Sequence, residues 1–286
     1  VLAHHRRRIV YLVDIDGENA GKNACGKLSC GLYAKGEGIA MLMDVYFEKM
    51  KETLAVIERT QREQIISAAR MVADTLENGG MWQILDTGHM LMHEGVGRTG
   101  GMMALKPILV TCEVNNPTRP RFIEGRPTIY YTQIPGFSKF VLNRANLTAG
   151  DTLIVGSVSG YEVFPVDVAI TAREMGVKVI GFTSVAYSQT LTPRHESGKR
   201  LYEVCDVVLD NCCKPGDTLV PCPELGIEVC PSSGIGASYL MWALQATVIE
   251  EMLARGKKPS VYMSNHAPGA TAHNAQAKKT YLELGY

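Results

Sequence analysis

The sequence lacks an excess of charge of either sign. Among its 286 residues, 29 are lysine or arginine and 29 are aspartate or glutamate, so the formal net charge at pH 7 is zero. Proteins that bind nucleic acids or anionic lipid surfaces through their overall field carry a strong positive balance, so the neutral balance argues against both classes of partner.

Long hydrophobic runs are also missing. No apolar stretch approaches the ~20 residues that a membrane-spanning helix needs. The first residues lack the charged-then-apolar order of a signal peptide. We therefore expect a soluble, cytoplasmic protein with no nucleic-acid or membrane partner.

Paired cysteine motifs are absent as well. The eight cysteines include no C-x2-C arm of the kind that makes a zinc site recognisable. Because the chain is large and shows no secretion signal, we expect buried free thiols, no metal and no cofactor. The alternative is a zinc site built from the five late cysteines, which are Cys205, Cys212, Cys213, Cys222 and Cys230.

Residues 1–42 differ from the rest of the chain. They are rich in glycine and asparagine and show no sustained period of 3.6 or 2 residues. We expect them to lie outside the fold as an N-terminal extension, or to result from a start site assigned too far upstream, with Met41 or Met43 as the true first residue. Residues 43–286 then form the folded domain.

The folded part opens on a helical pattern and continues with alternating strands and helices. Apolar residues at helical spacing between Asp44 and Gly79 predict one long N-terminal helix. Further helices are predicted at about 163–175 and 236–256, and a short helix is predicted over SGKRLYEVC, residues 197–205. Continuous apolar strands between helices indicate a parallel sheet covered on both faces, which is an α/β fold. The predicted strands span residues 81–86, 107–111, 152–156, 177–184 and 206–210.

The stretch GSVSG places Ser157, Ser159 and Gly160 where a predicted strand becomes a helix. In parallel sheets, ligands bind beyond the carboxyl ends of the strands. A helix N-terminus there offers free N–H groups and about half a positive charge. Two hydroxyls in alternate positions can donate to phosphate oxygens, so the stretch predicts an anion site suited to a phosphomonoester. The alternative is a capped loop whose serines satisfy only the backbone.

The segment TLIVGSVSGYEVFPVDVAITAREMGVKVIGFTS resembles the central signature of the sugar isomerase (SIS) phosphosugar-binding domain. That family has a Ser-x-Ser-Gly loop after one strand, and a second strand that closes on a pair such as Thr183 and Ser184. ILDTGHM, with Gly88 and His89, resembles the family's first strand and glycine loop, and RHESGKRLYEVCDVVLDN resembles a bacterial subgroup of SIS proteins without an assigned activity.

The resemblance covers about residues 43–286. It implies a flavodoxin-like, three-layer sandwich with a five-stranded parallel sheet. It also implies a homodimer or homotetramer with sites near the subunit interfaces, and phosphorylated sugars as ligands.

Two positions depart from the family pattern. The positions after Gly88 are His89 and Met90, where the family often has a serine, and Glu162 stands where a threonine or serine usually follows the phosphate loop. One hydroxyl of the implied cradle is therefore missing. A carboxylate beside a phosphate repels it by about 1 kcal/mol or more, depending on exposure.

The resemblance also implies site residues. A family glutamate on the helix after the first glycine loop corresponds to Glu94, which is the candidate base, and a late histidine that opens the sugar ring corresponds to His273. His89 is a candidate substrate contact. A metal site from His89, His93 and Glu94 is the alternative, although the third ligand would point about 100° away from the face shared by the histidines.

These residues predict an aldose–ketose isomerase that removes a proton next to a carbonyl and returns it to the neighbouring carbon. Two alternatives stay open. One is lyase or etherase chemistry on a phosphorylated amino sugar, which begins with the same proton abstraction. The other is a non-catalytic phosphosugar sensor or regulatory protein.

Overall fold

The computed structural model describes residues 33–35, 38–88, 91–111, 119, 125 and 130–286. Two short strands, β1 (Tyr33–Lys35) and β2 (Gly38–Ala40), pair antiparallel ahead of the first helix and form a separate sheet. Among the described helices, none is long and apolar enough to cross a membrane.

A five-stranded parallel sheet lies at the centre of the fold, in the order β4-β3-β5-β6-β7. This arrangement confirms the predicted α/β class and strand number. The three inner strands are short apolar segments of the kind that is buried on both faces. The strands are β3 (Trp82–Asp86), β4 (Leu105–Pro107), β5 (Thr152–Gly156), β6 (Lys178–Thr183) and β7 (Val207–Asp210).

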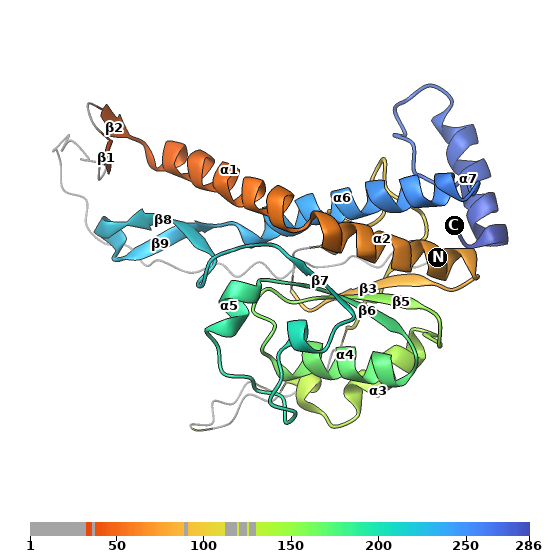
Figure 1. The fold of residues 1–286 in the computed structure, drawn as a ribbon, viewed down its shortest axis with the longest axis horizontal. Helices are drawn as coiled ribbons and strands as arrows, with labels where there is room; N and C mark the ends of the chain where they lie inside the picture. The colour runs from red at the N-terminus through yellow and green to blue at the C-terminus, as the bar shows by residue number, and fades with distance from the viewer. Residues whose placement is uncertain (1–32, 36–37, 89–90, 112–118, 120–124, 126–129) are drawn as a thin grey trace.

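Helices cover both faces of the sheet and complete the three layers (Figure 1). One face carries α2 (Arg62–Glu77) and α6 (Ser233–Ala254), and the other carries α3 (Phe137–Arg144) and α4 (Val163–Glu174). Each face has its own hydrophobic core. Because side chains alternate along a strand, Ile84 of β3 packs toward α2 and α6 while Leu85 packs toward α3 and α4.

The predicted long N-terminal helix is divided in two. α1 (Leu42–Thr60) ends and α2 begins on either side of Gln61. The Gln61 side chain is buried, and its Oε1 accepts a hydrogen bond from the backbone N–H of Asp210 at 2.9 Å. This contact with β7 joins the helix break to the end of the sheet, and the amphipathic pattern continues through it.

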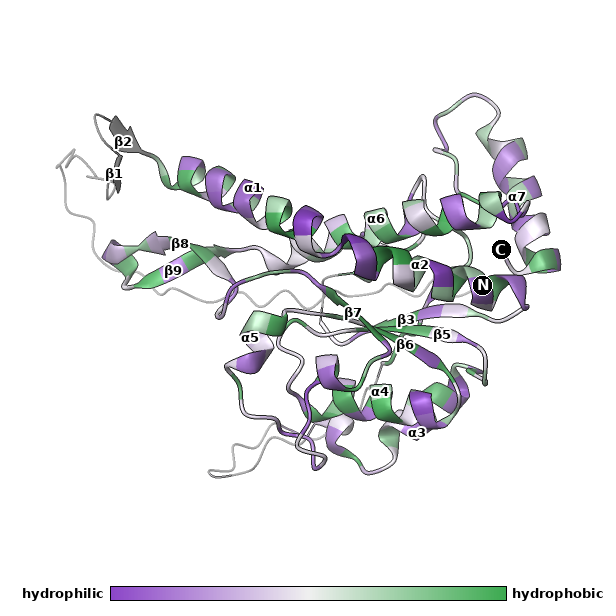
Figure 2. Cartoon of the chain, in the orientation of Figure 1, coloured by the Kyte–Doolittle hydropathy of each residue, from purple (hydrophilic) through white to green (hydrophobic). Residues whose placement is uncertain are grey.

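An arm extends from the body of the molecule. α1 runs beyond the sheet, and the antiparallel hairpin of β8 (Thr218–Cys222) and β9 (Ile227–Pro231) lies beside it (Figure 1). A small core around Met50, Leu219 and Val220 holds the two together. In Figure 2, α1 alternates between hydrophilic and hydrophobic segments, as expected of a helix with one packed face.

Three further differences from the sequence expectations are local. The strand predicted at 107–111 is shorter and earlier, because regular pairing with β3 covers only β4. The hairpin of β8 and β9 was not anticipated. The helix expected near residue 201 is a single 3-10 turn, Leu201–Glu203, and the remaining helices are α5 (Val185–Gln189) and α7 (Ala270–Leu284).

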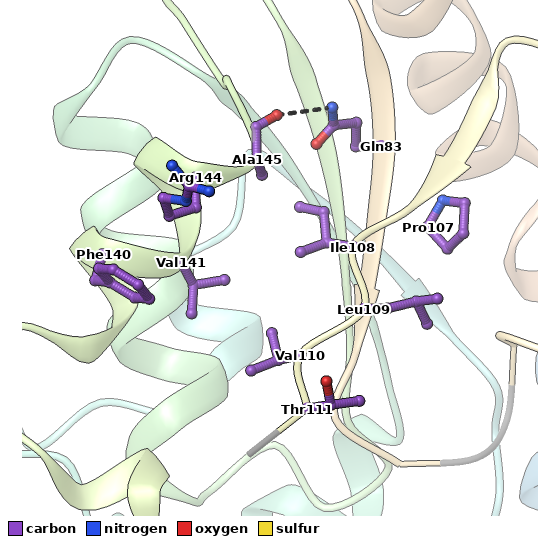
Figure 3. Close-up of a pocket in the computed structure, with 10 residues that line it drawn as sticks. All are labelled: Gln83, Pro107, Ile108, Leu109, Val110, Thr111, Phe140, Val141, Arg144 and Ala145. Carbon is purple, nitrogen blue, oxygen red and sulfur yellow. Dashed lines mark hydrogen bonds between the residues drawn. The ribbon is translucent and has the colours of Figure 1, made fainter. Parts of the chain in front are cut away.

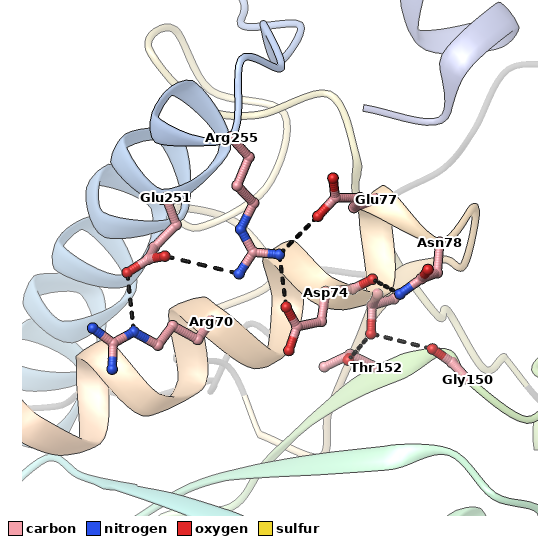
Figure 4. A network of polar contacts seen from close by, with 9 residues as sticks. Arg70, Asp74, Glu77, Asn78, Gly150, Thr152, Glu251 and Arg255 are labelled. Atoms are coloured by element: carbon pink, nitrogen blue, oxygen red, sulfur yellow. Dashed lines mark hydrogen bonds and ion pairs between the residues drawn. The ribbon is translucent and has the colours of Figure 1, made fainter.

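Polar contacts tie α2 to its neighbours (Figure 4). A guanidinium nitrogen of Arg255 lies 2.6 Å from Asp74 and 3.1 Å from Glu77, which anchors the end of α6 on α2. On the buried side of α2, Thr75 Oγ1 lies 2.7 Å from Thr152 Oγ1 and 3.2 Å from the carbonyl of Gly150. The contact with Thr152 connects α2 to the first residue of β5.

Replacing Thr75 by valine tests this buried contact. Thr75→Val keeps the shape of the side chain but leaves the Thr152 hydroxyl and the Gly150 carbonyl without their partner, so we expect a loss of about 1–3 kcal/mol in the free energy of unfolding, measured with urea. The matched control is Thr53→Val on α1, whose hydroxyl also donates to a carbonyl, that of Lys49, at 3.0 Å, but where water has access. Equal losses in both variants would contradict the role given to Thr75.

Candidate functional site

The carboxyl ends of the strands form the edge at which the candidate site lies. The residues that end the central strands are polar or small: Asp86 on β3, Gly156 on β5, Thr183 on β6 and Asp210 on β7. Asp86 shapes the first glycine loop, because its Oδ1 accepts from the N–H of Gly88 at 3.1 Å and its Oδ2 from Leu91 at 2.8 Å. Gly88 is exposed, and His89 lies outside the described residues.

The loop between β5 and α4 is a tight turn closed by its own hydroxyl. Ser157 is 8% exposed, its N–H donates to the Phe182 carbonyl at 2.9 Å, and its Oγ accepts from the N–H of Gly160 at 3.2 Å. Gly160 has a φ of +57°, which favours glycine. Ser159 is half-buried, and its hydroxyl has no hydrogen-bond partner among the described residues. Of the two serines, Ser159 is therefore the more accessible donor to a ligand, whereas Ser157 is buried and its oxygen already accepts from the turn.

The pair Thr183 and Ser184 holds this loop from behind. Thr183 Oγ1 donates to the Val158 carbonyl at 3.0 Å, and the N–H of Ser184 donates to the same carbonyl at 2.9 Å. Ser184 Oγ donates to the Cys213 carbonyl at 2.6 Å and caps α5 by accepting from Tyr187 N–H at 3.2 Å. Because both side chains are buried and bonded within the protein, this geometry favours a supporting role over direct ligand contact.

The carboxylate of Glu162 has a cation beside it that the sequence analysis did not identify. Arg194 lies in the loop before the 3-10 turn, and one of its guanidinium nitrogens is 2.8 and 3.2 Å from the two Glu162 oxygens. The guanidinium also lies over the ring of Tyr161, 5.0 Å from its centroid. The partners are 32 positions apart in the sequence, and the only signal for their contact is the unmatched charge of Glu162 near the loop.

A second missed residue is Ser188 on α5. Its side chain is fully buried, and its Oγ has no hydrogen-bond partner among the described residues. A Cβ placed on Gly160 would lie 3.2 Å from this hydroxyl and 2.7 Å from Thr183 Oγ1. The two hydroxyls therefore pack directly against the turn.

Glu94 lies on a different element from the serine loop. It is about half exposed and pairs with Arg98 at 3.3 Å. It lines a surface hollow of about 560 Å³ together with residues at the start of α6, among them Tyr239 and Trp242, and no serine of the loop belongs to that lining. One chain alone therefore does not enclose the candidate base with the candidate phosphate loop.

His273 is separated from the loop as well. It is exposed on α7, and its Nε2 lies 3.1 Å from the Val261 carbonyl. In Figure 1, α7 lies at the far right of the molecule, whereas α5 lies at the left, at the carboxyl ends of the strands. Within one chain the structure does not bring His273 to Ser159.

Burial makes the inner cysteines poor nucleophiles. Loss of solvent raises the pKa of the Cys205 and Cys213 thiols to about 12 and that of Cys212 to about 11. The cysteines of the described residues are free thiols, and no cluster of three metal-ligating side chains occurs in that part of the chain. Burial also raises the pKa of Asp210, although its Oδ1 accepts from Val185 and Cys212 N–H groups at 3.2 and 2.9 Å.

The fold and the serine loop define a class: parallel α/β domains in which a Ser-x-Ser-Gly turn opens the helix after a central strand. Similar solved structures include the phosphoheptose isomerase of Neisseria gonorrhoeae, with a TM-score of 0.45 and 16% identity over 72% of this chain and 96% of that chain. The phosphoheptose isomerase of Francisella tularensis has a TM-score of 0.45 and 17% identity over 73% and 96%.

Sequence comparison identifies the family. The SIS domain family matches residues 45–184. A UPF0309 protein of Geobacillus kaustophilus is 31% identical over 246 residues, which cover 85% of this chain and 95% of the relative. Another, from Halalkalibacterium halodurans, is 32% identical over 233 residues, or 80% and 90%. The chain belongs to the UPF0309 family of SIS-domain proteins, which confirms the resemblance drawn from its loop.

The turn at Gly160 is open to a direct test of stability. Gly160→Ala places an alanine in a left-handed backbone, which costs about 1–2 kcal/mol of folding free energy. Its Cβ would also collide with Thr183, which costs about 1–3 kcal/mol. The matched control is Gly198→Ala, because Gly198 has a φ of +66° but nothing within 4 Å of an added Cβ. We expect Gly160→Ala to lower the free energy of unfolding more than Gly198→Ala in a denaturant titration. Equal losses would mean that the turn tolerates a side chain.

Proposed function

We propose that this protein binds a phosphorylated sugar at the turn between β5 and α4 and acts on it as an aldose–ketose isomerase. The observation that carries the proposal is the turn itself. Gly160 keeps the backbone free of a side chain, Ser159 offers an unpaired hydroxyl, and α4 begins three residues later with its free N–H groups. Together these groups suit a phosphate, and the SIS resemblance implies a sugar as its carrier.

The pair of Glu162 and Arg194 accommodates the phosphate electrostatically. Glu162 alone would repel an anion at the start of α4. Arg194 offsets that charge at 2.8 Å and places a guanidinium beside the same turn. Since guanidinium groups recognise phosphate through paired donors, Arg194 is also available to the ligand's phosphate if it leaves Glu162.

In the proposed reaction, Glu94 removes a proton from the carbon next to the sugar's carbonyl and returns it to the neighbouring carbon. His273 donates a proton that opens the sugar ring, and no metal or cofactor is needed. The phosphate handle fixes the reacting carbons in position, so that proximity of the base to the carbon contributes much of the rate.

This reaction requires more than one chain, and we propose a homodimer or homotetramer. Glu94 lines a hollow whose other walls include Ile235, Tyr239 and Trp242, and both Ile235 and Tyr239 are exposed large side chains. A second copy seated on this part of α6 would exclude water from Glu94 and can supply the acid that its own chain does not place nearby. Light scattering in solution gives the number of copies.

A non-catalytic phosphosugar sensor is the second candidate function, and a specific observation favours it. Glu94 is about half exposed and paired with Arg98, which is an ordinary arrangement for a surface glutamate. A lyase or etherase acting on a phosphorylated amino sugar shares the proton abstraction and the same base. Turnover, and not binding, separates these functions.

Ser159→Ala tests the phosphate turn without removing a hydrogen bond from the folded protein. Wild type, screened by thermal shift against a panel of sugar phosphates, is expected to be stabilised by about 2.7 kcal/mol at 100 times the dissociation constant. Ser159→Ala removes a hydroxyl bonded to a charged phosphate, so it should weaken binding about tenfold or more. The double variant Ser157→Ala/Ser159→Ala should weaken binding further. Ser264→Ala, away from the turn, is the control. An unchanged shift in the double variant would overturn the proposal.

Glu94→Gln separates catalysis from binding. The amide keeps the size of the side chain but cannot accept the proton, so we expect turnover to fall by about 10²–10⁴-fold with little change in affinity. The control is Glu283→Gln, because Glu283 is an exposed carboxylate that also faces a cation four residues away, Lys279. If several sugar phosphates bind the wild type and none is converted, the sensor function replaces the isomerase.

A further inference from the structure

A second cavity lies away from the serine loop, between α3 and the segment that follows β4 (Figure 3). Its volume is about 400 Å³, within the range of small-molecule sites. It opens at the edge of the sheet, on the face covered by α3 and α4, and no residue of the Ser157–Gly160 turn lines it. The side chains that line it include Gln83, Ile108, Val110, Phe140, Val141 and Arg144.

Gln83 places a polar group at the back of this cavity. Along β3, Trp82 and Ile84 pack into the core beneath α2, so Gln83 faces the opposite core, beside Leu85. An apolar residue is the rule at such a position, yet Gln83 is only 9% exposed. Its Nε2 donates to the Ala145 carbonyl at 3.1 Å, and its Oε1 is buried without a hydrogen-bond partner among the described residues.

The orientation of the Gln83 amide follows from the contacts of its nitrogen, because Nε2 donates to the Ala145 carbonyl and also lies 3.8 Å from Met81 Sδ. Because Nε2 donates to Ala145, the residue that follows α3, Oε1 is the amide atom nearer to Ile108, which lines the cavity (Figure 3). A buried acceptor without a donor is unfavourable, and native proteins satisfy most such atoms. The geometry therefore calls for a hydrogen-bond donor from outside the described chain.

Arg144 supplies a positive charge at the rim. It lies in the last turn of α3, is exposed, and forms no ion pair with any described residue. It lines the same cavity as Gln83. An anionic group entering here meets an unopposed guanidinium, which favours carboxylates and phosphates.

The remaining walls are apolar. Ile108, Val110 and Val141 line the inside, and Phe140 remains 61% exposed beside the opening. Leu109, next to them, is 74% exposed. Exposed large apolar side chains around a hollow indicate a surface that something covers.

We propose that this cavity is a second ligand site, for a small apolar acid that carries one hydrogen-bond donor. The donor reaches Gln83 Oε1, the apolar body lies between Ile108, Val110 and Val141, and the anionic group lies against Arg144. The site is independent of the proposed isomerase function, because none of its residues belongs to the serine loop or to the hollow at Glu94.

The test uses three probes of one shape, 4-hydroxybenzoate, 4-methylbenzoate and methyl 4-hydroxybenzoate, titrated against the full-length chain by NMR. 4-Hydroxybenzoate carries both a hydrogen-bond donor and a negative charge. 4-Methylbenzoate lacks the donor, and methyl 4-hydroxybenzoate lacks the charge. We expect 4-hydroxybenzoate to bind most tightly. Gln83→Met, which keeps the length but removes the acceptor, should weaken it about tenfold and leave 4-methylbenzoate within about twofold.

Arg144→Gln should weaken both acids about tenfold and leave the ester unchanged. Lys139→Gln is the matched control, since it removes an exposed charge from the same helix outside the cavity lining and should change nothing. If Gln83→Met does not fold, two measurements still test the proposal without altering the buried amide. They are the affinity of Arg144→Gln for the acids and the comparison of methyl 4-hydroxybenzoate with 4-hydroxybenzoate on the wild type. Absence of saturable binding up to about 10 mM, or equal binding by wild type and Arg144→Gln, overturns the proposal.

Discussion

The left-handed turn at Gly160 is the constraint on which the carboxyl edge of the sheet depends. Its φ is +57°, its carbonyl accepts from Leu201 N–H at 2.7 Å, and a side chain there would collide with Thr183. One glycine thus joins the end of β5, the end of β6 and the 3-10 turn at Leu201. Because β5 and β6 are parallel and Gly156 lies opposite Phe182, both strands end at one level and the turn opens toward α4.

The parts of the fold that the sequence predicts are those governed by neighbouring residues. The apolar segments 81–86, 152–156 and 177–184 are too continuous for a half-exposed strand, so they require a sheet covered on both faces, which β3, β5 and β6 form. The loop after residue 156 is predicted by the small residues of its GSVSG stretch. The same pattern predicted a strand at 107–111, and these bounds were wrong. Regular pairing with β3 is limited to β4, which begins two residues earlier.

The parts that the sequence does not predict depend on contacts between distant residues. The helix break at Gln61 reflects a hydrogen bond to Asp210, and no local signal opposes the amphipathic pattern there. The partner of Glu162 is Arg194, which lies 32 positions further along the chain in a polar loop. His273 and Ser159 belong to the same motif-based hypothesis, but α7 and α5 lie at opposite ends of the molecule. Spacing along the chain carries no information about such distances.

Three buried side-chain oxygens have no hydrogen-bond partner among the described residues, and they belong to Gln83, Ser138 and Ser188. Two of them lie beside candidate sites, Gln83 at the cavity next to α3 and Ser188 at the turn of Gly160. Each costs about 1–3 kcal/mol when unsatisfied, which is large beside a net stability of about 5–15 kcal/mol. Ser188 packs against Gly160, so its hydroxyl can influence a phosphate only through the turn that it supports. Gln83 faces a cavity of about 400 Å³, where a donor can enter. An unpaired buried oxygen therefore packs against the phosphate turn at Ser188, whereas at Gln83 it faces a cavity that can admit a ligand.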